Sequence, residues 1–484
     1  MSVLGNYEPK NVLGFFEEIC GIPHGSHDTK KISDFLKKFA EDRNLECYQD
    51  ELNNIIIIKE ATTGYENSDP IILQGHMDMV CEKTPESTID FKTDGLKLLI
   101  DGDWLTADGT TLGGDDGVAV AMCLAVLDSE ELSHPRVEVI LTVDEEVGLL
   151  GAEGIDVSML KGKKFINIDS EEEGIFTTSC AGGVTTINTI PVTLEKAQGV
   201  VVSIKVDGLQ GGHSGIEIDK ERGNGNILMG RVLRELKKNA PFRIAELSGG
   251  TKDNAICKLT EAKIVIDKEN VVKAAEVAAE MTEIYANEYR VTDPDVKVTC
   301  SVETEAGELE AADAVGTGKM ITYLINTPNG IYHMSKDIDG LVETSLNLGA
   351  LSFTDGVMKA MYAVRSSVGS RRDMLCGKLE SLAEVLGGTT EYAGAYPGWE
   401  YKADSPLRDT CIAVFERMYG KAPRVEAIHA GLECGLFAGK IGKELDCVSI
   451  GPDMEWVHTP DERLSLSSTK RVWEFLVEVL KESK

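Results

Sequence analysis

Apolar and polar residues alternate along the first 183 residues in a pattern typical of an α/β domain. Helical segments are indicated at residues 32–40 and 117–127. Short apolar runs typical of buried strands occur at residues 55–58, 71–73, 137–143 and 165–168. We therefore predict a central mixed sheet flanked by helices.

The pattern changes between residues 184 and 391. Strand-like runs occur here at residues 200–206, 262–266, 296–302, 345–351 and 358–364, with a helical segment at 271–285. The earlier pattern returns after about residue 392, with helices expected at 405–419 and from 468, and strands at 424–428 and 445–450. The sequence therefore predicts a discontinuous α/β domain, residues 1–183 and 392–484, with an inserted α+β domain over residues 184–391.

The composition restricts the cellular location and the partners. Of the 484 residues, 42% are hydrophobic and 27% charged, and no run of 18 apolar residues or export signal is evident. The 11 cysteines include no CxxC pair, which favours reduced thiols over disulfides or a zinc–thiolate site. A net charge of −32 repels nucleic acid and anionic lipid. We predict a cytoplasmic protein without nucleic-acid or membrane partners.

Two motifs place polar residues at the ends of predicted elements. The strand at residues 71–73 runs into the tetrapeptide GHMD, whose His76 and Asp78 fall on the same side of an extended chain. Asp115 and Asp116 follow two glycines directly before the second predicted helix. A surface pair and an ordinary N-cap are the simpler explanations. The flanking glycines favour close approach of the backbone to a ligand, which supports a metal site.

Further carboxylates follow the other buried strands. Three acids, of which the last two are Glu145 and Glu146, follow the strand at residues 137–143, and Asp169 ends the next one. A solvated loop would also explain the three acids, but like charges packed together need cations or protons. A general base beside a metal-binding carboxylate is what activation of water requires. His458 precedes the last helix, where a lone histidine is usually structural.

Five of these residues form a candidate ligand set: His76, Asp115, Glu146, Asp169 and His458. They supply two imidazoles and three carboxylates. This set suits paired Zn²⁺, Mn²⁺ or Co²⁺ ions better than a structural zinc bound by thiolates.

The order of the motifs, HxD, GxxDxxG, EE, D and H, resembles that of the dimetal exopeptidases of the carboxypeptidase G2 and succinyl-diaminopimelate desuccinylase superfamily. The sequence is most similar to the aminoacyl-histidine dipeptidase (peptidase D) family. The similarity runs through GHMDMV, LGGDDGVAVA, TVDEEVGLLGA, INIDSEEEG, HSGIEI, NAI and HAGLECGLF. It extends over essentially the whole chain, from Ile22 to Glu462.

The resemblance implies a division of labour among the five ligands. Asp115 would bridge two divalent metal ions, most simply Zn²⁺. His76 and Asp169 would complete one site, and Glu146 and His458 the other.

The resemblance also assigns the catalytic residues. Glu145 would be the general base, taking a proton from a metal-bridging water and passing it to the leaving amine, while Asp78 would orient His76. The family further implies a cis peptide bond after Asp115.

The inserted domain would act as a lid and as a dimerisation domain. His213 would stabilise the oxyanion, with Asn254 beside it, and Arg365 would bind the substrate carboxylate. Gly431 and Glu433 would line the pocket near the metals. An ordinary turn histidine, an ion-paired arginine and a structural buried acid are the alternatives at His213, Arg365 and Glu433. A homodimer formed through the lid is implied by the resemblance alone.

Two histidines near the N-terminus, His24 and His27, lie in a turn before the first long predicted helix. Capping of that helix by Ser26 or Asp28 is expected there rather than metal ligation.

The predicted function is that of a cytosolic dimetal hydrolase that cleaves dipeptides with broad specificity, Xaa-His peptides such as β-alanyl-histidine included. An aminoacylase, a desuccinylase or a tripeptidase with the same metal site is the alternative among hydrolases. A non-catalytic metal-binding regulatory protein is the alternative from another class. Retention of Glu145 together with all five ligands argues against it.

Overall fold

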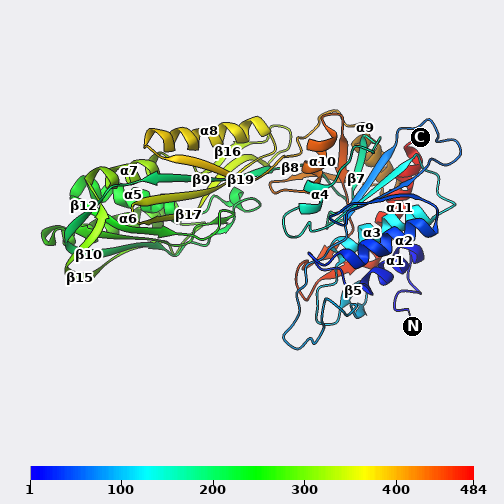
Figure 1. Ribbon diagram of the computed structural model, residues 1–484, viewed down its shortest axis with the longest axis horizontal. Helices are drawn as coiled ribbons and strands as arrows, with labels where there is room; N and C mark the ends of the chain where they lie inside the picture. The colour runs from blue at the N-terminus through cyan, green and yellow to red at the C-terminus, as the bar shows by residue number, and fades with distance from the viewer. Residues whose placement is uncertain (1) are drawn as a thin grey trace. The chain divides into compact units, whose positions relative to one another are not determined.

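Two large β-sheets organise the chain, one in each of two units of the computed structural model, which describes residues 2–484. The first unit consists of Met1–Ser179, Tyr401–Ala427 and Leu432–Lys484, and the second of Cys180–Glu400 and Ile428–Gly431. Figure 1 shows the helices and strands of both units. The predicted mixed α/β architecture is confirmed. The role of the second unit as a lid stays a prediction.

The first unit is built on an eight-stranded mixed sheet with the order β1-β2-β6-β3-β7-β21-β8-β20. Its strands are β1 (Glu46–Gln49), β2 (Ile55–Lys59), β3 (Ile71–His76), β6 (Val137–Thr142), β7 (Lys164–Asn167), β8 (Ile175–Cys180), β20 (Arg424–Ile428) and β21 (Asp446–Ser449). β3 pairs in parallel with β6 and β7, and β7 with β21. β3 and β6 are buried along their whole length, which explains why apolar residues predominate in both.

Helices of the first unit share a hydrophobic core with this sheet. The helices are α1 (Lys10–Cys20), α2 (Lys30–Asp42), α3 (Gly114–Asp128), α4 (Leu150–Gly154), α9 (Pro406–Tyr419), α10 (Glu433–Ile441) and α11 (Leu466–Glu482). α3 is buried on all sides except at its last residue, as expected of a helix that is apolar all round. Its N-terminus, which carries Asp115, is therefore held firmly in the unit.

A small four-stranded sheet of the first unit joins distant parts of the sequence. Its order is β22 (Met454–Glu455), β23 (Arg463–Ser465), β5 (Trp104–Ala107) and β4 (Leu98–Asp101). β23 pairs with β5 from Arg463 opposite Thr106 to Ser465 opposite Trp104. His458 lies in the connection between β22 and β23, so this sheet fixes both ends of the segment that carries it.

The second unit contains a nine-stranded antiparallel sheet with the order β15-β10-β14-β12-β17-β18-β9-β19, in which β16 also pairs with β17. Its strands are β9 (Gly182–Pro191), β10 (Leu194–Asp207), β12 (Phe242–Gly249), β14 (Thr260–Ile266), β15 (Lys297–Ala312), β16 (Gly330–Met334), β17 (Val342–Thr354), β18 (Val357–Ser366) and β19 (Thr389–Tyr396). A separate ribbon pairs β11 (Gly212–His213) with β13 (Ala255–Ile256).

The helices of the second unit pack with this sheet into one core. They are α5 (Gly225–Asn239), α6 (Val271–Glu288), α7 (Ala314–Asn326) and α8 (Gly369–Val385), with 3-10 turns at Ile218–Lys220 and Lys268–Asn270. The ribbon drawing shows α5, α7 and α8 over the strands of this unit (Figure 1).

Most predicted elements are present, with limits shifted by a few residues; the last helix, for example, begins at Leu466 rather than at residue 468. The prediction of a side-chain cap for α2 is wrong. Thr29 is the N-cap of α2, and no side chain caps this helix. Ser26 was expected as a cap, but its hydroxyl donates instead to Asp78 Oδ2 at 2.8 Å.

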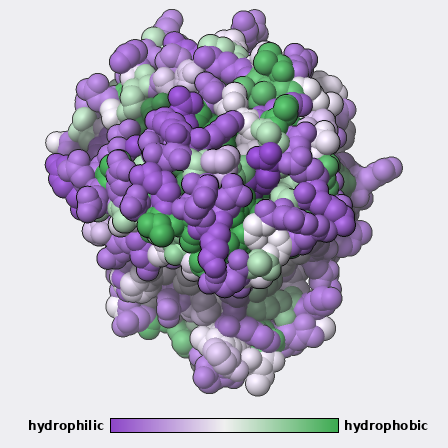
Figure 2. Space-filling view, turned by 90° about the vertical axis from the view of Figure 1, so that its left-hand side faces the viewer, coloured by the Kyte–Doolittle hydropathy of each residue, from purple (hydrophilic) through white to green (hydrophobic). Residues whose placement is uncertain are grey.

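The surface agrees with the acidic composition. Figure 2 shows a face on which hydrophilic residues predominate and apolar residues form small separate patches. Within residues 2–484, no helix combines the length and the hydropathy needed to cross a bilayer.

Candidate metal centre

In the first unit, candidate metal ligands lie at the C-terminal ends of three neighbouring strands. β3 pairs in parallel with β6 and β7, so their C-terminal ends meet at one edge of the sheet. β3 ends at His76, β6 leads into the acidic loop with Glu145 and Glu146, and Asp169 follows β7. His76 is 1% exposed, and its Nε2 lies 3.6 Å from Asp169 Oδ1.

Asp115 lies between the two histidines. Its Oδ1 is 3.0 Å from His76 Nε2, and its Oδ2 is 3.1 Å from His458 Nε2. The peptide bond between Asp115 and Asp116 is cis, as the resemblance implies. Each carboxylate oxygen of Asp115 thus faces a different imidazole, which is the arrangement expected of a ligand that bridges two ions.

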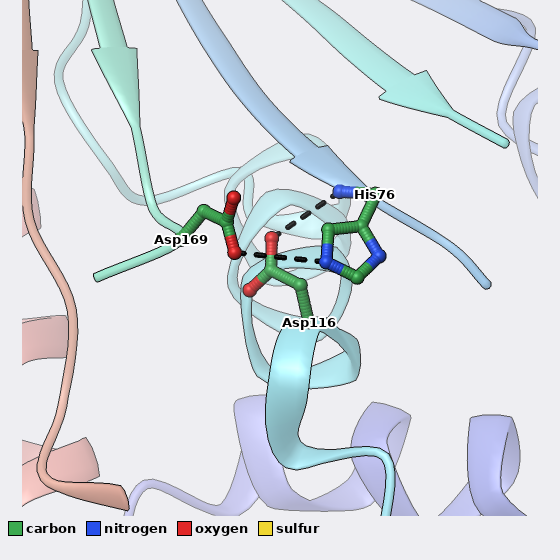
Figure 3. Close-up of side chains that lie close together, drawn as sticks. All are labelled: His76, Asp116 and Asp169. Carbon is green, nitrogen blue, oxygen red and sulfur yellow. Dashed lines mark hydrogen bonds and ion pairs between the residues drawn. The ribbon is translucent and has the colours of Figure 1, made fainter. Parts of the chain in front are cut away.

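Asp116, the next residue, has different surroundings. Its Oδ2 accepts a hydrogen bond from the backbone N–H of His76 at 3.2 Å, and its Oδ1 has no hydrogen-bond partner among residues 2–484. Figure 3 shows Asp116 beside the backbone of His76, while Asp169 reaches the imidazole ring. Burial, and then the charge of Asp169, raise the pKa of Asp116 well above its ordinary value. Asp116 therefore supports the backbone of His76 rather than its imidazole ring.

His458 faces two carboxylates from different segments. Its Nε2 lies 3.1 Å from Asp115 Oδ2 and 2.9 Å from Glu146 Oε1. The residue has a φ of 65°, and 49% of its side chain is exposed. A single imidazole nitrogen opposite two carboxylate oxygens is the geometry of three groups that converge on a cation.

The ionisable groups of this centre perturb one another. Hydrogen bonds to Asp115 and then to Glu146 raise the pKa of His458 to about 10. Burial alone would raise the pKa of Asp115, but hydrogen bonds from both histidines hold it well below its ordinary value. Burial raises the pKa of Asp169 to about 6. The centre therefore concentrates more buried negative charge than its two imidazoles can compensate.

The donor set fits divalent cations. Groups whose ligand atoms lie within 4.8 Å of one another are His76, Asp116 and Asp169; His76, Glu145 and Glu146; and Asp115, Glu146 and His458. Imidazole and carboxylate donors suit Zn²⁺, Mn²⁺ and Co²⁺, and cations here would compensate the buried carboxylates. The structure brings together all five residues that the sequence proposed as ligands. Their individual roles stay a prediction.

Asp78 links His76 to the loop that carries Glu145. His76 Nδ1 lies 3.0 Å from the backbone carbonyl oxygen of Asp78 and 3.5 Å from Asp78 Oδ1. Asp78 Oδ1 also accepts the backbone N–H of Glu145 at 3.1 Å, and its Oδ2 accepts the hydroxyl of Ser26. These contacts keep the proton of His76 on Nδ1 and leave Nε2 for a metal. The contact with Ser26 was missed because it joins segments 52 residues apart.

The side-chain carboxylate of Glu145 forms no hydrogen bond with any of the described residues. The backbone of Glu145 is held in place, because its N–H donates to Asp78 Oδ1 at 3.1 Å and its carbonyl accepts the N–H groups of Gly148 at 3.0 Å and Leu149 at 2.9 Å. Burial is the main cause that raises the pKa of Glu145 well above its ordinary value, and the charges of Asp169 and Glu433 add to it. An uncommitted acid next to the candidate ligands can act as a general base once cations offset the surrounding negative charge.

The predicted oxyanion residue, His213, lies in the second unit. Its Nδ1 accepts hydrogen bonds from the backbone N–H groups of Gly215 and Ile216, both at 3.2 Å. The proton of the neutral ring must then be on Nε2. Burial, and then the charge of Arg365, lower the pKa of His213, which favours this neutral form. The HSG turn thus prepares His213 Nε2 as a hydrogen-bond donor.

Arg365 is buried in the second unit and forms no ion pair with an acid among the described residues. It is 9% exposed, its Nη1 donates to Tyr396 Oη at 3.0 Å, and its Nε has no hydrogen-bond partner among residues 2–484. Nearby His429 pairs through Nε2 with Ser345 Oγ at 2.7 Å. Burial, and then Arg365 and His213, lower the pKa of His429 to about 3, so it is neutral. A buried guanidinium with spare donors is suited to binding an anion.

Asn254 and Gly431 also lie in the second unit. Asn254 is exposed in the turn before β13, and its backbone oxygen accepts the N–H of Ser214 at 2.8 Å. This bond ties the turn to the one that carries His213. A Cβ at Gly431 would lie 2.8 Å from Tyr396 Cε2, so glycine is required for the close approach. Contacts of either residue with substrate stay a prediction.

Glu433 belongs to the first unit and is fully buried at the start of α10. Its Oε2 accepts hydrogen bonds from Thr142 Oγ1 at 2.8 Å and from Gln74 Nε2, while its Oε1 has no partner among the described residues. Burial raises the pKa of Glu433 to about 8. Its burial and its two hydrogen bonds suit a structural acid, and its place in the substrate pocket stays a prediction.

An α/β unit with imidazole and carboxylate donors at its strand ends, beside an uncommitted acid, is typical of metal-dependent hydrolases. The chain belongs to peptidase family M20/M25/M40, whose sequence profile matches residues 72–482. The family resemblance drawn from the motifs is thereby confirmed.

Several relatives match over their full length. The chain is 37% identical to the cytosol non-specific dipeptidase of Escherichia coli (strain K12) over 486 residues, which cover 100% of this chain and 99% of the relative. The crystal structure of aminoacylhistidine dipeptidase from Vibrio alginolyticus superposes with a TM-score of 0.93 and 36% identity, covering 99% of this chain and 98% of that chain. Aminopeptidase PepT from Bacillus cereus ATCC 10987 shares the fold, with a TM-score of 0.55, 16% identity and 99% of both chains covered.

Proposed function

We propose that this chain is a two-metal dipeptidase. The observation that carries the proposal is the position of Asp115, whose two oxygens lie 3.0 and 3.1 Å from His76 Nε2 and His458 Nε2. Two relatives that match over the whole length are named as dipeptidases, which supports dipeptides as the substrate class.

The ligands divide between two ions. His76 and Asp169 would hold one ion, Glu146 and His458 the other, and Asp115 both. Bound there, divalent ions would supply Lewis acidity that polarises the peptide carbonyl and makes water a stronger acid. Zinc is the ion that we propose, and manganese and cobalt suit the same donors.

Glu145 carries out the proton transfers. Its free carboxylate would take a proton from the attacking water and deliver it to the nitrogen of the leaving amine. Asp78 keeps the reacting groups in place, because its carboxylate binds the backbone of Glu145 while its backbone oxygen holds His76 Nδ1.

Residues of the second unit recognise the substrate. Arg365 has unused donors and would bind the terminal carboxylate of the dipeptide, with which a guanidinium can form two hydrogen bonds. His213, with its proton on Nε2, would donate to the oxygen of the scissile carbonyl. We also propose a homodimer formed through this unit and a cytosolic location, the latter supported by the name of the Escherichia coli relative.

The substrate class is tested by product analysis with purified enzyme. Gly-His, a tripeptide and an N-acetyl amino acid are compared at equal concentration in the presence of zinc. We expect Gly-His to be cleaved with the highest kcat/KM. Preferential turnover of the acetylated compound would assign the chain to the aminoacylases, and preferential turnover of the tripeptide would make it a tripeptidase.

Arg365→Met is expected to lower kcat/KM for Gly-His by about 10- to 100-fold, the value of roughly 1.5–3 kcal/mol for hydrogen bonds to a charged group. The same substitution should have little effect on Gly-His amide, which lacks the terminal carboxylate. The measurement is the ratio of kcat/KM for the acid to that for the amide.

Arg231→Met is the matched control for this experiment. Arg231 lies in α5 of the same unit, and its guanidinium pairs with Glu288 at 2.6 Å. The control should preserve the preference for the free carboxylate. If Arg365→Met also preserves it, Arg365 does not bind the carboxylate.

A further inference from the structure

Glu462 lies four residues after the candidate ligand His458 and is only 2% exposed. Its backbone is fixed on two sides, because its N–H donates to the carbonyl of Thr459 at 3.0 Å and its carbonyl accepts the hydroxyl of Thr106 at 2.9 Å. The next residue begins β23, which pairs with β5. The side chain of Glu462 therefore projects from a rigid point close to His458 in the sequence.

Both carboxylate oxygens of Glu462 bind the loop that leads to Asp115. Oε2 accepts the N–H groups of Leu112 at 2.9 Å and Gly113 at 3.3 Å. Oε1 accepts those of Gly114 at 2.8 Å and, more weakly, Asp115 at 3.5 Å. Successive backbone N–H groups that point at one spot form a nest for an anion. Without Glu462 these buried donors would have no partner in the structure described here, which is costly.

The glycines of this loop are explained by the same contact. Gly113 has a φ of 66°, a conformation that favours glycine, and it turns its N–H toward Glu462. A Cβ at Gly114 would lie 3.3 Å from Glu462 Oε1 and 3.3 Å from Met454 Sδ. The two glycines of the LGGDDG motif thus allow the side-chain carboxylate of Glu462 to come close to the loop backbone.

We propose that Glu462 is a positioning residue that sets the bridging carboxylate of Asp115 against His458, and through them the spacing of the two metal positions. It is not a ligand, because its oxygens are occupied by backbone N–H groups, and it belongs to none of the ligand groups found within residues 2–484. The carboxylate of Glu462 thereby links the loop before Asp115 to the segment that carries His458, about 350 residues away in the sequence. The inference rests on the proposed metal centre.

The test is zinc binding by Glu462→Gln, measured by calorimetric titration of the metal-free full-length protein. Glutamine keeps the size of the side chain, but it replaces one acceptor oxygen by an NH₂ group that faces backbone donors. We expect zinc affinity to fall by about 10- to 100-fold, as for other residues that support metal ligands. kcat should fall more than KM rises, and excess zinc should restore part of the activity.

Asp461→Asn is the matched control, because Asp461 is the adjacent acid and is exposed. It removes the same charge from the same segment and should leave zinc affinity unchanged. Thermal unfolding with and without zinc separates positioning from general stability: the zinc-induced rise in Tm should shrink in Glu462→Gln but not in Asp461→Asn.

Gly114→Ala is a second, milder variant for the case that Glu462→Gln does not fold. It crowds Glu462 Oε1 and should weaken zinc binding in the same direction. Wild-type zinc affinity in a folded Glu462→Gln or Gly114→Ala protein overturns the positioning role. If the wild-type protein itself binds no pair of ions, the proposed function fails instead.

Discussion

Glu145→Gln is expected to lower kcat for dipeptide hydrolysis by about 10²- to 10⁴-fold, the usual contribution of a general base. The glutamine amide cannot accept the proton of the attacking water or return it to the leaving amine. The backbone N–H of residue 145 should still bind Asp78, so the loop should keep its shape. The measurement is kcat for Gly-His together with zinc content per chain, which should be unchanged.

The zinc content decides between two roles of Glu145. The side chain lies within ligand distance of His76 and Glu146, so it could instead complete a metal site. Loss of zinc in Glu145→Gln would make it a ligand, and near-normal kcat would remove it from the mechanism. Glu153→Gln, at an exposed position in the nearby helix α4, is the control for the loss of one negative charge.

Asp115→Asn is expected to weaken the binding of both ions by more than about 100-fold, because even changes outside the ligand set cost up to about 100-fold. Asparagine is neutral and retains only one oxygen, so it cannot face His76 and His458 with a carboxylate oxygen each. Hydrolysis should fall below detection at zinc concentrations that saturate the wild type. Calorimetric titration of the metal-free variant measures the loss.

Asp116→Asn provides the sharpest comparison for this variant. Asp116 is adjacent and completely buried, but burial raises its pKa well above its ordinary value, whereas at Asp115 burial is outweighed by hydrogen bonds from both histidines, which lower the pKa. Asp116 Oδ2 accepts the backbone N–H of His76, and neither oxygen of Asp116 forms a hydrogen bond with an imidazole of residues 2–484, so zinc binding should be affected much less than in Asp115→Asn. The reverse order of effects would show that Asp116, which also lies near His76 and Asp169, is the shared ligand.

The fold of the first unit and its candidate ligands could largely be predicted from the sequence. β3, β6 and β7 each contain a short apolar run, and their parallel pairing brings the residues that follow them to one edge. A polar residue directly after a buried strand therefore indicates a position in the functional site. His76 and Asp169 are the clearest cases, because the position of each follows from its own strand.

Residues that act through distant contacts could not be predicted in this way. Ser26 looks like a helix cap in the sequence, yet its hydroxyl binds Asp78. Glu462 reaches the loop before Asp115 only because β23 pairs with β5, and short strands of three or four residues carry little sequence signal. Contacts of this kind depend on tertiary pairing, which local periodicity does not encode.

The second unit shows the same limit. The HSG turn identified His213, and Arg365 was placed at the end of a predicted strand. Tyr396, whose hydroxyl accepts a hydrogen bond from Arg365, lies in no recognised motif, and His429 opens the HAGLECGLF motif without having been assigned a role. Their proximity to Arg365 depends on the fold, which brings β18 and the segment at 428–431 into one unit.

The central claim is that two metal ions at Asp115 make this chain a dipeptidase. It is tested most directly by stripping the wild-type protein of metal with a chelator and titrating zinc back while Gly-His hydrolysis is followed. Hydrolysis should be absent at the start and should reach its plateau at about two zinc ions per chain. Full activity of the metal-free protein, or a plateau at a single ion, would contradict the claim.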